Sequence, residues 1–182
     1  TVKVKICGIT NLEDGLAACA AGADALGFVL APEAKARNRY IALEEAQEIV
    51  AALPPFVTTV AVCVNETLGR LAKIFTVFDL VQFHGEERPE EIPLPHAAIK
   101  AFRAGPDFDI ETMRAYDARA WLLDASVPAQ RGGTGGEHRV AAVGKTGQRL
   151  KTVGSPLHGG QRQQQQRTGE DDRHHARLID PK

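Results

Sequence analysis

Polar side chains capable of acid-base chemistry stand at the ends of short apolar runs within the first 125 residues. Such runs are typical of buried strands, and in parallel α/β proteins the functional groups lie at the carboxyl ends of strands. A thiol, a carboxylate and an imidazole in these positions can take up and release protons. The residues concerned are Cys7, Asn65, Gln82, His84, Lys100, Arg103 and Asp124, and the loop after the second run adds Lys35, Arg37 and Arg39.

Each of these residues also has a purely structural interpretation. A cysteine at a strand end is more often a small buried apolar residue than a catalyst, although Gly8 beside Cys7 lets the backbone approach a ligand. Asp124 could cap a helix, and His84 could bond a neighbouring loop. The segment QRGGTGG is linker-like in composition, yet its successive N–H groups are also suited to holding an anion. Position alone leaves these alternatives open.

The elements that must position these residues alternate between strands and helices. Amphipathic spacing predicts a helix that starts after Asn11 and ends at Gly22, and further helices over 43–53, 67–75 and 110–116. Three prolines between residues 86 and 96 allow at most a turn or two of helix there. Strands are predicted at 2–7, 25–30, 57–64, 79–83, 97–102 and 120–125.

Strands this apolar on successive residues are buried on both faces, as in a parallel sheet covered by helices. An open doubly wound sheet and a (β/α)8 TIM barrel both fit this pattern. The segment CGITN after the first strand lacks the Gly-rich turn that cradles a pyrophosphate. The sequence therefore favours the barrel, of which about six βα units are legible.

Composition narrows the class of partner. The 182 residues carry a net charge of −1, which does not favour a nucleic-acid or anionic-membrane binder. The three cysteines are widely spaced and fit neither a disulfide framework nor a metal site. No apolar run approaches 18 residues. We expect a soluble, cytoplasmic protein that binds a small molecule.

The motifs KICGIT, GADALGF, QFHGEE, LLDASVP and GGTGG, in this order, resemble phosphoribosylanthranilate isomerase, a (β/α)8-barrel family of tryptophan biosynthesis, over residues 2 to about 136. The resemblance implies an Amadori rearrangement of N-(5-phosphoribosyl)anthranilate to 1-(2-carboxyphenylamino)-1-deoxyribulose 5-phosphate, without metal or organic cofactor. It implies that Cys7 is the base and Asp124 the acid, that Arg39 contacts the anthranilate carboxylate, and that Gln82, His84, Gly133 and Gly135 bind substrate.

Residues 136–182 do not follow the family pattern. This segment is rich in Gln, Arg and His, contains none of the chain's aromatic residues and shows no strand pattern. We therefore predict a barrel portion over 1–135 and an irregular, out-of-frame tail over 136–182; a natural low-complexity tail is the alternative. Without the last two strands, the first and sixth strands would be unpaired and the phosphate loops missing, so we expect poor folding and no isomerase activity.

Two rival functions differ in what they require. Another phosphosugar barrel enzyme, such as an epimerase or a synthase, needs metal ligands or a Lys/Glu pair at the strand ends, in place of Cys7 and Asp124. An inactive barrel fragment that serves only as a binding or assembly partner would bind ligand without turnover.

Overall fold

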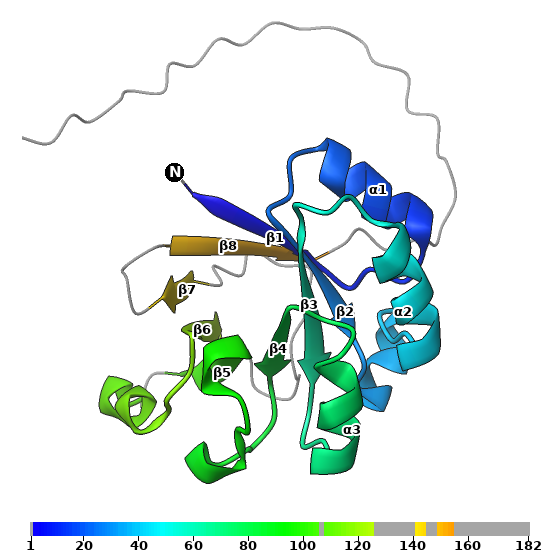
Figure 1. Cartoon of the computed structure of the whole chain (residues 1–182). Coiled ribbons are helices and arrows are strands. Elements are labelled where there is room, and N and C mark those ends of the chain that lie inside the picture. The colour runs from blue at the N-terminus through cyan, green and yellow to red at the C-terminus, as the bar shows by residue number, and fades with distance from the viewer. Residues whose placement is uncertain (1, 106–107, 126–140, 145–148, 155–182) are drawn as a thin grey trace, which may run out of the picture.

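Six parallel strands, paired in chain order, form the main part of the structure (Figure 1). The computed structural model describes residues 2–105, 108–125, 141–144 and 149–154. The six strands fall where the sequence predicts them, within one or two residues at their ends. Their bounds are Lys3–Cys7 (β1), Ala25–Val29 (β2), Thr58–Cys63 (β3), Leu80–Phe83 (β4), Ala98–Ala104 (β5) and Ala120–Ala125 (β6).

Three α-helices cover the outer side of the first four strands (Figure 1). They are α1 (Leu12–Ala20), α2 (Leu43–Ala52) and α3 (Leu68–Ile74). The N-cap of α1 is Asn11, as predicted, and its side chain accepts a hydrogen bond of 2.8 Å from the Asp14 backbone N–H.

The remaining connections contain only short 3₁₀ helices. These are η1 (Pro32–Arg37), η2 (Pro89–Glu91), η3 (Pro95–Ala97) and η4 (Ile110–Ala115). The two three-residue turns between β4 and β5 confirm the effect predicted for the prolines there. The helix predicted over 110–116 forms as the 3₁₀ helix η4.

Two further strands, β7 (Ala141–Gly144) and β8 (Arg149–Gly154), close the barrel. β7 runs antiparallel to β6 and to β8, and β8 pairs in parallel with β1. The prediction that no strand follows residue 136, and that β1 and β6 are left unpaired, is therefore wrong. Open edges present unpaired N–H and C=O groups, and these two short segments pair with both of them. The rest of the predicted tail, including 155–182, lies outside the described residues.

The direction of β7 determines which strand ends meet at each rim. Its first residue, Ala141, pairs with Leu123 near the end of β6, whereas its last residue, Gly144, pairs with Ala120 at the start of β6. The last residue of β8, Gly154, pairs with Cys7 at the end of β1. One rim, here called the mouth, therefore holds the carboxyl ends of β1–β6 and β8 and the amino end of β7.

Apolar side chains pack on both faces of the sheet. Inside the barrel, Ala25, Val60, Ile99, Ala101 and Leu122 form a small cluster. A larger cluster, which includes Leu26, Phe28, Ile49 and Phe83, lies between the sheet and the helices. Register partners share a face, so Gln82, which pairs with Ile99, and Asp124, two residues after Leu122, point to the same inner side as this cluster. Val29 and Val62 share this side near the mouth. Within the described ranges, no helix has the length and apolar character needed to span a membrane.

Candidate active site at the barrel mouth

Cys7 ends β1 and lies beside Gly27 of β2, its register partner. A Cβ atom at Gly27 would lie 2.7 Å from Cys7 Sγ and 3.1 Å from Lys5 Nζ, so only glycine leaves room for both side chains. Lys5 is fully buried inside the barrel, directly below Cys7 on the same face of β1. The sequence alone predicts no role for Gly27. A glycine inside an apolar strand was the available signal, because it often marks a close approach.

Arg39 reaches the mouth across Gly8, the residue that follows Cys7. A Cβ atom at Gly8 would lie 3.3 Å from Arg39 Cγ, and Gly8 also adopts a positive φ of 94° that side-chain-bearing residues avoid. The methylene stem of Arg39 therefore packs on the backbone beside the thiol. Among the described residues, no carboxylate forms an ion pair with its guanidinium, which suits a group that binds an external anion.

A chain of polar contacts crosses the barrel from β1 to β6. Lys5 Nζ donates to Gln82 Oε1 at 3.0 Å, and Gln82 Nε2 lies 2.8 Å from His84 Nδ1. His84 Nε2 in turn lies 3.3 Å from Asp124 Oδ2. Lys5 and Gln82 are buried, whereas His84 and Asp124 retain partial exposure at the mouth. The structure thus brings together three of the predicted site residues, together with Lys5.

The loop that carries His84 is held by a buried carboxylate. Glu87 is 6% exposed, and its Oε1 accepts a 2.8 Å hydrogen bond from the Asn65 N–H while its Oε2 accepts one of 3.0 Å from the Gly85 N–H. Asn65, with φ of 50°, returns a contact by accepting from the Glu86 N–H at 2.8 Å. Sequence reasoning missed Glu87, because its role depends on tertiary contacts. These bonds fix the backbone from which His84 projects.

Lys100 does not belong to the mouth. It faces the helices rather than the barrel interior, and its Nζ contacts Glu87 Oε2 at 2.7 Å and the Gly85 carbonyl at 2.8 Å. The Tyr116 ring lies 5.6 Å from the ammonium, and its hydroxyl donates to the Glu87 carbonyl at 3.1 Å. Burial, and then the charge of Glu87, raise the pKa of Tyr116. The expectation that Lys100 joins the rim set is wrong, because strand alternation directs it outward.

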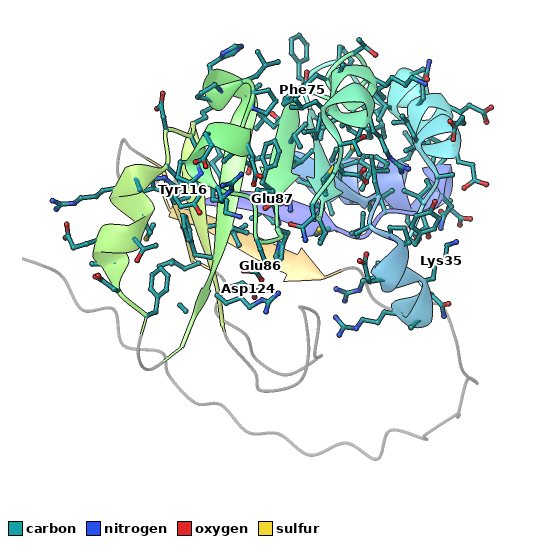
Figure 2. All side chains as sticks on the ribbon, turned by 90° about the horizontal axis from the view of Figure 1, so that it is seen from below. Lys35, Phe75, Glu86, Glu87, Tyr116 and Asp124 are labelled. Carbon is teal, nitrogen blue, oxygen red and sulfur yellow. The ribbon has the colours of Figure 1, made fainter. Side chains whose placement is uncertain are left out.

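Two other predicted rim cations, Arg103 and Lys35, contact residues that do not belong to the series of contacts from Lys5 to Asp124. Arg103 lies 3.7 Å from Glu86, and both side chains are exposed. Lys35 of η1 stacks its ammonium 4.7 Å above the Tyr40 ring. Figure 2 shows Glu86, Asp124 and Lys35 in the lower half of the view; Glu86 follows β4, Asp124 lies near the end of β6 and Lys35 follows β2.

The three cysteines are in different environments. Cys63 is fully buried in the outer apolar cluster, and burial raises its pKa to about 12. Cys19 lies on α1 and packs against the same cluster, and burial raises its pKa as well. Cys7 is thus the one thiol at the mouth. Gly133 and Gly135, predicted to bind substrate, lie outside the described residues.

The fold and this site define a (β/α)8-type barrel with a thiol and a carboxylate at the ends of its first and sixth strands. The model of the family described as "N-(5'phosphoribosyl)anthranilate (PRA) isomerase" matches residues 4–154. The chain belongs to this family. The match extends past residue 136, which corrects the expectation that the family resemblance stops there.

Relatives and solved structures agree with this assignment. An N-(5'-phosphoribosyl)anthranilate isomerase of Pelobacter propionicus is 45% identical over 137 residues, 74% of this chain and 64% of that protein. The crystal structure of phosphoribosyl anthranilate isomerase from Thermotoga maritima matches with a TM-score of 0.63 and 40% identity, over 74% of this chain and 66% of that one. A structure of the isomerase in complex with reduced 1-(o-carboxyphenylamino)-1-deoxyribulose 5-phosphate has a TM-score of 0.60 and 41% identity, over 69% and 66%. The chain therefore spans about two thirds of the length of these proteins.

Proposed function

We propose that this barrel carries the catalytic groups for the Amadori rearrangement of N-(5-phosphoribosyl)anthranilate. The observation that carries the proposal is the placement of Cys7 and Asp124 on the inner face of the mouth, on strands three positions apart in a ring of eight. An acid and a base on different sides of a bound substrate are what the reaction requires. The ligand bound in the related complex is a reduced form of the product expected here.

The proposed roles follow the order of bond changes. Asp124 gives a proton to the ribose ring oxygen as the C1–O bond breaks, and the lone pair of the anthranilate nitrogen forms the C=N bond. The resulting Schiff base acidifies the hydrogen on C2, which Cys7 removes as a proton to give an enol. Tautomerisation of the enol yields the ketose.

Arg39 is proposed to bind the anthranilate carboxylate through its guanidinium. Arg39→Ala is expected to raise KM by a factor that corresponds to about 1.5–3 kcal/mol, the usual value of a hydrogen bond to a charged group, with a smaller effect on kcat. Steady-state kinetics with varied substrate measures both constants. Arg37→Ala on η1 is the matched control and should raise KM much less. Equal effects of the two substitutions would reduce the role of Arg39 to general electrostatic attraction.

The phosphate anchor is where this chain departs from a fully parallel barrel. Loops at the carboxyl ends of the last two strands commonly hold the phosphate in this fold. Here β7 runs the other way, so its carboxyl end lies at the rim opposite the mouth. Phosphate binding supplies remote binding energy that orients the reacting part of the substrate. We therefore propose that chain 1–182 binds substrate too weakly for measurable turnover.

A chimera tests both parts of the proposal. In it, residues 136–182 are replaced by the corresponding segment of the Pelobacter propionicus relative. We expect isomerase turnover from the chimera and none from the unaltered chain, with N-(5-phosphoribosyl)anthranilate as substrate. An inactive but folded chimera would contradict the proposed function. Full turnover by the unaltered chain would show that its own segment anchors the phosphate.

A further inference from the structure

We propose that Lys5 and Gln82 are positioning residues that hold His84 as its Nε2–H tautomer, so that His84 donates to Asp124 Oδ2 and leaves Oδ1 to carry the acidic proton. The assignment of the tautomer depends only on the contacts between these side chains. The consequence for Asp124 rests on the proposed function, in which this residue is the general acid.

The first step of the argument concerns the orientation of the Gln82 amide. A lysine ammonium has three donor hydrogens and no acceptor, so the Gln82 atom 3.0 Å from Lys5 Nζ must be the oxygen. Rotating the amide would turn its NH₂ group toward the ammonium and leave two buried donors facing each other. Lys5 and Gln82 are 0% and 3% exposed, so water does not compensate for such a mismatch.

The second step fixes the proton on the imidazole. With its oxygen facing Lys5, Gln82 presents its NH₂ group to His84 Nδ1 at 2.8 Å. Nδ1 must therefore accept, and it can do so only through its lone pair. A neutral imidazole carries its proton on one nitrogen, so the proton is on Nε2. Two buried neighbours, neither of them a carboxylate, thus select the tautomer of a partly exposed histidine.

The third step concerns Asp124. His84 Nε2 lies 3.3 Å from Oδ2, so the Nε2–H form directs its proton toward this oxygen. A proton added to the carboxyl group then goes to Oδ1, because Oδ2 faces the imidazole N–H. The opposite tautomer would direct a lone pair at Oδ2 and hold the acidic proton of Asp124 between the two side chains. The contact chain therefore keeps that proton available for transfer rather than shared with His84.

The test reads the tautomer directly in the full chain. Two-bond ¹H–¹⁵N correlation spectra distinguish Nε2–H from Nδ1–H, and the His84→Gln variant identifies the signals of His84 among the six histidines. At pH 8, where a free imidazole is neutral, the unaltered protein should show the Nε2–H form. A wild-type spectrum with Nδ1 protonated would overturn the proposal, whatever the variants show.

Two variants test the positioning residues. Gln82→Glu keeps the shape but presents an acceptor to Nδ1, so Nδ1 of His84 should gain a proton. Lys5→Met removes the group that orients the amide, so His84 should show both tautomers. Gln47→Glu adds the same charge on an exposed position of α2 and should leave the spectrum unchanged. Retention of the pure Nε2–H form in either Gln82→Glu or Lys5→Met would overturn the role of that residue.

These spectra are independent of turnover. If the chimera fails as an isomerase while His84 shows the Nε2–H form, the proposed function fails and the tautomer assignment stands. If the chimera is active while Nδ1 is protonated, the assignment fails and the function stands.

Discussion

Asp124→Asn and Cys7→Ser are each expected to lower kcat by roughly 10²-fold or more in the active chimera, with a much smaller change in KM. An amide cannot deliver the proton that opens the ribose ring. A serine hydroxyl is a far weaker acid than a thiol, so it offers almost no anionic base at neutral pH. Both substitutions preserve side-chain size, so substrate binding should change little. Steady-state kinetics at pH 7–8 gives the two constants.

Cys19→Ser is the matched control for the thiol, because it makes the same chemical change on α1, away from the mouth. It should keep nearly the full kcat. Thermal unfolding of each variant shows whether any loss of activity reflects loss of the fold. Near-native turnover by Cys7→Ser or by Asp124→Asn would remove that residue from its proposed role.

Lys100→Met is expected to lower the free energy of unfolding by roughly 3–5 kcal/mol, because it leaves the buried Glu87 carboxylate without its ammonium partner. The two side chains are only 4% and 6% exposed, and their charged atoms lie 2.7 Å apart. The same substitution removes a hydrogen bond to the Gly85 carbonyl. Urea denaturation of the full chain, monitored by Trp121 fluorescence, measures the change.

Arg88→Met is the control for this ion pair. Arg88 contacts Glu90 and Glu91 on the surface, where it is 68% exposed, so its loss should cost less than about 1 kcal/mol. Glu87→Gln completes a double-mutant cycle with Lys100→Met, and the two losses should not be additive, because they break one shared network. A loss for Lys100→Met no larger than that for Arg88→Met would show that the pair contributes little.

The parallel strands were predictable because their signal is local. The run at 57–64 is β-branched and apolar on successive residues, as is typical of a strand buried on both faces. Helix starts were equally local: Asn11 and Thr67 each accept a hydrogen bond from the backbone N–H three residues later. By contrast, the helix predicted over 110–116 forms only a 3₁₀ helix, η4. In so short a segment, the spacing of apolar residues does not distinguish an α-helix from a 3₁₀ helix.

The sequence indicates which residues stand at the strand ends better than it indicates which side chains they contact. Strand ends indicated Gln82 and His84, and the structure brings these two side chains into contact. Lys100 was assigned to the wrong face, because a strand-end residue reaches the mouth only when its alternation turns it inward. The roles of Lys5 and Glu87 depend on neighbours far along the chain, so no local pattern reveals them.

The last two strands were not predictable from local pattern at all. β7 has only four residues, and its sequence AAVG carries no alternation. β8 has the sequence RLKTVG, a mixed run that also suits a loop. Pairing with the open edges of β6 and β1 determines their conformation, so the decisive information lies elsewhere in the chain.

The β1–β8 pairing also has a consequence for the order of folding. It joins residues 3–7 to residues 150–154, the most distant strand contact in the described chain, whereas every other pairing joins neighbours in sequence. Loop-closure entropy makes such a contact slow to form, so the seam between β1 and β8 should close last. During synthesis β1 emerges long before its second partner does, and its free edge stays open to other chains throughout that interval. We therefore expect aggregation during expression to fall when fewer chains are made at the same time, because association between free β1 edges depends on the concentration of incomplete chains.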